Sequence, residues 1–127
     1  MFHYSMQTPK TVEKAVQALE GTLKEEGFGV LWNFDLQGTL QNKGVDFSSE
    51  YKILEVCNPK EAEKVLTEDK LVGNFLPCKV IVFEENSQTT ISMPKPTVLI
   101  GHMENQQLLD IAEDIEQRMK TCIDKAV

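Results

Sequence analysis

The chain has 127 residues, of which 41% are hydrophobic and 26% charged, as is usual for one soluble globular domain with its own core. Thirteen basic and twenty acidic side chains give a net charge of −7, and no stripe of Lys or Arg is present, so neither a nucleic acid nor an anionic membrane is an expected partner. We predict a single domain over residues 1–127, because the length suits one domain and no linker is visible. No run approaches the roughly 20 apolar residues of a membrane span.

The start of the chain also bears on where the protein works. Residues 1–10 lack the basic start and apolar stretch of a signal peptide, which favours a cytoplasmic location. Thiols stay mostly reduced in that compartment, and three cysteines without a CxxC spacing are no disulfide framework. We therefore expect three free thiols.

The first elements are predicted from their hydrophobic periodicity. Apolar and polar residues alternate over residues 2–6, which predicts a strand. Apolar residues then recur at helical spacing over residues 12–23, with Thr8 as the expected N-cap. Gly27 is the expected left-handed residue that ends this helix.

The aromatic and β-branched run of residues 28–34 predicts a second strand. Trp32 and Phe34 share the parity of Phe28 and Val30 along this run. Because side chains of equal parity lie on one face of a strand, all four are expected to pack in the core.

The middle of the chain predicts a short helix, a strand and a longer helix. Asp35 offers an N-cap for the short helix, which Gly44 should end. Residues 51–57 form the third predicted strand. Asn58 then caps the longer helix, with Pro59 in its first turn.

The last third predicts a hairpin and a C-terminal helix. Residues 80–83 and 89–93 form the hairpin, after which two prolines break the chain. Residues 97–100 are either a fifth strand or a packed loop, and residues 108–123 trace an amphipathic helix. The order β-α-β-(α)-β-α-β-β-α predicts an α+β fold, with helices packed on one face of a mixed or antiparallel sheet.

Cys57 is the first candidate for a functional side chain. It ends a predicted strand directly before Asn58, the expected cap of a helix. The positive end of the helix dipole would stabilise a thiolate there, and the free amides could bind an anion. The alternative is that Cys57 only fills the core, as strand cysteines usually do.

Cys78 is the second candidate, at the start of the hairpin. If the strands next to Cys57 and Cys78 are antiparallel neighbours, both sulfurs lie at one end of the sheet, within reach of a disulfide or a shared metal. The alternative is that the sulfurs never meet. Two thiols without a third ligand fall short of a zinc site, so no metal or cofactor is expected.

Four other side chains complete the candidates. Glu55 shares its strand face with Cys57, and Cys122 lies on the apolar stripe of the last helix, where it should be core. His3 alternates away from the apolar face of the first strand. His102 could supply a ligand or base near the sheet end, but loop histidines are more often simply exposed. No nucleotide-binding or hydrolase motif occurs.

The cysteine segments also carry a family resemblance. The chain resembles the DUF302 domain in four segments, namely residues 27–31 (GFGVL), 44–47 (GVDF), 51–59 (YKILEVCNP) and 73–83 (GNFLPCKVIVF). The resemblance covers roughly residues 2–123. It implies a small α+β domain of the TT1751-like kind in the cytoplasm of bacteria or archaea, allows a homodimer, and implies no activity. Residues 93–105 depart most from the family pattern, so His102 inherits no role.

Three functions remain open at this point. The first is a non-catalytic module that binds a small molecule or a partner protein near Cys57 and Cys78, with Asn58 and Glu55 close by; we favour it because no base accompanies either thiol. The second is a thiol enzyme or redox sensor, in which Cys57 reacts and Cys78 resolves the product. The third is a homodimer formed through an apolar strip at residues 99–100.

Overall fold

The computed structural model describes all residues from 1 to 127. Its elements follow the order β1 (His3–Thr8), α1 (Val12–Glu25), β2 (Gly29–Asp35), α2 (Leu36–Asn42), β3 (Tyr51–Cys57), α3 (Pro59–Glu68), the 3-10 helix η1 (Lys70–Phe75), β4 (Cys78–Glu85), β5 (Gln88–Pro94), α4 (Pro96–Gly101) and α5 (Gln106–Ala126).

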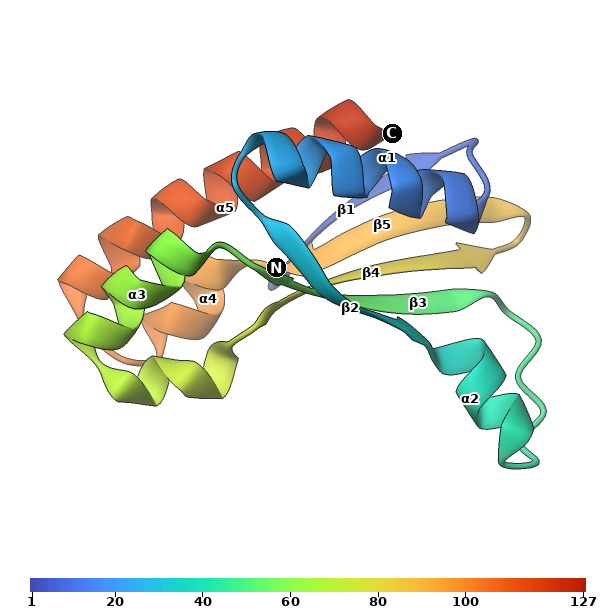
Figure 1. Cartoon of the computed structure of the whole chain (residues 1–127), viewed down its shortest axis with the longest axis horizontal. Coiled ribbons are helices and arrows are strands. Elements are labelled where there is room, and N and C mark those ends of the chain that lie inside the picture. Colours follow the sequence, from blue (N-terminus) through green and yellow to red (C-terminus); the bar gives the residue numbers. More distant parts are fainter.

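The five strands form one sheet in the order β1-β5-β4-β3-β2, and every neighbouring pair is antiparallel. Helices α1 and α5 lie side by side across one face of this sheet (Figure 1). Helices α3 and α4 and η1 gather around the first half of α5, beyond one end of the sheet. The predicted α+β fold with helices on one face is confirmed, and the sheet is wholly antiparallel.

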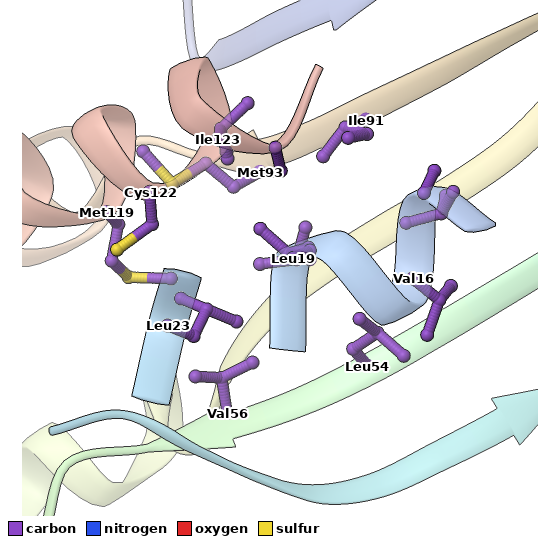
Figure 2. Packing of buried hydrophobic residues seen from close by; sticks show 14 of the residues in the cluster. Val16, Leu19, Leu23, Leu54, Val56, Ile91, Met93, Met119, Cys122 and Ile123 are labelled. Atoms are coloured by element: carbon purple, nitrogen blue, oxygen red, sulfur yellow. The ribbon is translucent and has the colours of Figure 1, made fainter. Parts of the chain in front are cut away.

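The main core lies between the sheet and the two long helices. Figure 2 shows Leu19 and Leu23 of α1 pointing toward Leu54 and Val56 of β3, while Cys122 of α5 reaches into the same layer. All five are at most 1% exposed, so Cys122 is core, as the sequence predicted. A second, smaller cluster joins α3, η1, α4 and α5 and contains Val65, Val72, Ile100, Leu108 and Ala112.

The N-terminus of α1 differs from the prediction by one turn. Thr8 is the last residue of β1, and the N-cap is Thr11, whose side chain accepts a hydrogen bond from the N–H of Lys14. The prediction of Thr8 as the cap was wrong because Pro9 lies two residues before the N-cap instead of in the first turn of the helix. At the other end Gly27 has φ +83°, so the expected left-handed residue is confirmed.

A β-bulge in β2 overturns the expected burial of two aromatic residues. Val30 pairs with Val56 and Trp32 pairs with Glu55, so Leu31 is an extra residue with no partner across the strand pair. Beyond the bulge the parity of β2 is reversed, and Trp32 and Phe34 lie on the face of the sheet that carries no long helix. Trp32 is 53% exposed, so the prediction that it packs in the core was wrong.

Residues 97–100 are neither a strand nor a packed loop, because they belong to the short helix α4. Pro96 occupies the first turn of this helix, where a missing N–H costs nothing. Ile100 is only 7% exposed and lies in the second cluster. The exposed apolar strip that the sequence predicted at residues 99–100 is therefore absent.

Candidate functional site

Cys57 and Cys78 lie at the same end of the sheet. Strands β3 and β4 are antiparallel neighbours, and Val56 is directly opposite Cys78. Because opposite residues share a face, the side chain of Cys78 points with Val56 toward the helix-covered side. Both cysteines are free thiols that line one small cavity at this end of the sheet.

The surroundings of Cys78 favour its neutral form. Burial raises the pKa of the Cys78 thiol to about 11, and the nearby Cys57 contributes to the rise. Burial likewise raises the pKa of Cys122 to about 11. At neutral pH Cys78 is therefore an uncharged, weakly polar group in an apolar wall.

The polar candidates near the thiols are engaged in structural contacts. The Oδ1 atom of Asn58 accepts hydrogen bonds from the N–H groups of Lys60 and Glu61, as its predicted role as helix cap requires. Its Nδ2 atom donates to the carbonyl oxygen of Glu26, which ties α3 to the end of α1. Glu55 forms an ion pair with Lys79, opposite it on β4, with 3.3 Å between Oε1 and Nζ.

The two histidines lie apart from the thiols. His3 is half-buried on the first edge strand, and its Nδ1 atom is 2.7 Å from the Oγ atom of Ser5. His102 follows α4 and is exposed. No group of three His, Cys, Asp or Glu side chains is placed to hold a metal ion.

A pocket of about 200 Å³, partly open to solvent, lies directly beside Cys78. Its walls come from α3, η1, the start of β4, α4 and α5, and ten of its fifteen lining residues are hydrophobic. Its lining includes Val72, Phe75, Leu76, Cys78 and Leu99. The smaller cavity shares Val65, Leu76, Cys78 and Ile115 with this pocket, so the side chains of these four residues stand between the two spaces.

The lining is almost entirely apolar, and no buried polar side-chain atom in the chain lacks a hydrogen-bond partner. Buried polar groups that await a ligand would be unpaired in this structure. The walls of the pocket thus offer shape and apolar contact, with Cys78 as the one thiol among them.

Sequence reasoning located Cys78 but missed most of the pocket. The walls from η1 and α4 come from segments for which the sequence predicted no helix. The missed signal is the apolar content of residues 71–76, where four of six side chains (Leu71, Val72, Phe75 and Leu76) are hydrophobic without helical or strand periodicity. Such a segment is typical of a short packed connection.

Comparison with known proteins identifies the family of this chain. The sequence model described as "Domain of unknown function DUF302" matches residues 4–126. The chain belongs to the DUF302 family. A crystal structure of an uncharacterized conserved DUF302 protein from Bacillus stearothermophilus is 51% identical in sequence, covers 100% of this chain and 99% of its own, and superposes with a TM-score of 0.98. A comparison with curated proteins finds no match.

The family match includes every candidate side chain of this DUF302 domain except His3, which precedes residue 4. It also spans residues 93–105, where the sequence was expected to resemble the family least. The family's description assigns no function to the domain. None of its helices combines the length and apolar character needed to cross a membrane.

Proposed function

We propose that this domain is a non-catalytic binding module that holds a small, uncharged, apolar molecule in the pocket beside Cys78. The observation that carries the proposal is the pocket itself, which combines a hollow of about 200 Å³ with an almost wholly apolar lining. Pockets of this character between helices and a sheet end are the usual places where small molecules bind.

The volume limits the size of the ligand. An apolar cavity of about 150 Å³ binds benzene, so a pocket of about 200 Å³ has room for a molecule of roughly ten non-hydrogen atoms. Ligands of this size gain at most about 1.5 kcal/mol per non-hydrogen atom, and usually much less. We therefore expect affinities in the micromolar to millimolar range.

The chemistry of the walls limits the charge of the ligand. A carboxylate or ammonium group placed against this lining would lose its water without gaining a partner, which is strongly unfavourable. Cys78 adds no charge, because burial raises its pKa to about 11. Its polarisable sulfur suits contact with an aromatic or sulfur-containing ligand.

Binding can be measured by ligand-observed NMR with naphthalene and indole as probes and naphthalene-1-sulfonate as their charged counterpart. The proposal predicts saturable binding of both neutral probes and at least tenfold weaker binding of the anion. If neither neutral probe binds, or if the anion binds as well as naphthalene, the proposal is wrong.

A pair of variants assigns the binding to this pocket. Leu99 lines the pocket, whereas its neighbour Val98 does not. Leu99→Trp places a larger ring at the pocket wall and should abolish binding of naphthalene, while Val98→Trp should leave it unchanged. Binding that survives Leu99→Trp in a folded protein would contradict the assignment.

A further inference from the structure

One face of the sheet carries no long helix. Helices α1 and α5 cover the opposite face, and on the side away from them only α2 and the loop after it contact the sheet, at one end of β2 and β3 (Figure 1). We call this side the open face, and the strand register assigns to it the side chains of Trp32, Phe34, Tyr51, Ile53, Glu55, Lys79, Ile81 and Phe83.

The open face is apolar and largely aromatic. Trp32 stacks on Phe34 with 4.8 Å between ring centroids, and Tyr51 stacks on Phe83 at 5.3 Å. The bulge at Leu31 brings the first pair to this face, since without the reversal of parity both rings would lie under the helices. The two stacked ring pairs form one contiguous apolar surface, whose exposure to water is unfavourable for a monomer. Contiguous apolar patches of this kind mark interaction sites.

Charge distinguishes the open face from the rest of the molecule. The chain carries a net charge of −7, yet on this face Glu55 and Lys79 neutralise each other at 3.3 Å. Many of the acidic residues lie on α1, α3 and α5 instead. Two copies can therefore bring their open faces together without like-charge repulsion, whereas contact through their helices would oppose negative charges.

The area fits a weak dimer. Strands β2, β3 and β4, about 4.8 Å apart and roughly seven residues long at about 3.3 Å per residue, cover roughly 330 Å² in projection. Two such faces supply roughly 670 Å², less than the 1,200 Å² or so at which stable interfaces begin, so the dimer is expected to be transient and to form at high concentration. A polar rim completes the pattern, because Ser5 donates a hydrogen bond to Ser92 at 2.7 Å beside the apolar strands.

We propose that the open face binds a second copy of this chain, so that two sheets pack face to face about a two-fold axis. Aromatic rows from β2 of one copy then pack against β4 of the other, and the helices stay on the two outer surfaces. This arrangement is independent of the pocket beside Cys78, which lies on the helix-covered side of the sheet.

The proposal is tested by sedimentation velocity from micromolar to millimolar concentration, together with tryptophan fluorescence. Trp32 is the only tryptophan, so its emission reports on the open face directly. We expect the mass to rise from monomer to dimer with concentration, and the emission to move to shorter wavelength over the same range. A mass that stays monomeric throughout, or a dimer without the emission shift, overturns the proposal.

Two variants provide the matched comparison. Trp32 and Leu71 are 53% and 66% exposed, but Leu71 lies on η1, away from the open face. Trp32→Lys should raise the dimer dissociation constant at least about tenfold, as expected when a large aromatic contact is replaced by a charge, while Leu71→Lys should leave it unchanged. Circular dichroism checks that both variants are folded. A folded Trp32→Lys variant that dimerises as the wild type does would refute the proposal.

Discussion

Glu116 of α5 caps α4 through Thr97. Its Oε1 atom accepts a hydrogen bond from the Thr97 N–H at 3.1 Å and another from the Thr97 hydroxyl at 2.7 Å. Lys95, the N-cap residue of α4, makes no side-chain capping bond, so the carboxylate of a distant helix takes over that role. Since α4 forms a wall of the pocket, Glu116 helps to hold the pocket in shape.

The first prediction concerns the charge of Glu116. Burial would raise its pKa, but the hydrogen bonds from Thr97 and the hydrogen bond and charge of Lys120 outweigh burial and lower the pKa. Glu116→Gln keeps the shape and an acceptor oxygen but loses the charge, so we expect urea unfolding at pH 7 to show a loss of about 1–2 kcal/mol.

The same contact predicts a pH dependence. A carboxyl group whose pKa is lower in the folded state stabilises the fold above its unfolded pKa, about 4.3, and loses this contribution as the pH falls through the folded pKa. The stability difference between wild type and Glu116→Gln should be constant from pH 6 to 8 and shrink below about pH 4. The exposed Glu113 on the same helix provides the control, since Glu113→Gln should show neither effect. A difference that grows at low pH would contradict this account.

The failed predictions for Trp32 and α4 have the same physical origin. Strand parity is a local rule, and a single unpaired residue at Leu31 reverses it for everything that follows in β2. The sequence of residues 28–34 contains no signal for the bulge, because the position of the bulge depends on the pairing of β2 with β3. Helix α4 likewise depends on Glu116, nineteen residues along the chain, for its cap. Long amphipathic helices such as α1 and α5 were predictable because the spacing of the apolar residues within each helix defines its buried face.

The second prediction concerns the reactivity of Cys78. With a pKa of about 11, its thiolate fraction near pH 8 is up to about a hundredfold smaller than that of an ordinary thiol. Residue-resolved alkylation with iodoacetamide should therefore leave Cys78 largely unmodified in the native protein and label it quickly after unfolding in urea. Cys122, whose pKa is also raised to about 11, should behave in the same way. Fast labelling of native Cys78 at pH 8 would instead favour the thiol enzyme or redox sensor.

The third prediction compares two glycines with left-handed backbones. Gly27 has φ +83° and Gly44 has φ +80°, so alanine is strained at either position. A Cβ atom at Gly27 would also lie 3.1 Å from the Nδ2 atom of Asn58, which bonds the carbonyl of Glu26, whereas nothing lies within 4 Å at Gly44. Gly27→Ala should cost about 1 kcal/mol more than Gly44→Ala, measured by urea unfolding. Equal losses would show that the contact with Asn58 makes no difference to the free energy of unfolding.

The last prediction concerns Arg118, which joins α1, α3 and α5 at one point. Its guanidinium contacts Glu26 at 3.1 Å and Glu61 at 3.4 Å, and it lies over the ring of Phe28 at 5.3 Å. The side chain of Glu61 is only 8% exposed, and without Arg118 its one remaining ionic partner is Lys64. Arg118→Met keeps much of the apolar stem but leaves this carboxylate poorly compensated, so we expect a loss of about 2–3 kcal/mol in urea unfolding.

Two further variants separate the buried contact of Arg118 from its exposed one. The side chain of Asp114 also contacts Arg118, at 3.3 Å, but is 63% exposed, so Asp114→Ala should cost less than about 0.5 kcal/mol. In the Arg118→Met background, Glu61→Gln removes the uncompensated charge and should restore part of the lost stability, whereas in the wild type it should be destabilising. If Glu61→Gln has the same effect in both backgrounds, the two residues are not coupled, and the loss in Arg118→Met must come from its contacts with Glu26 and Phe28.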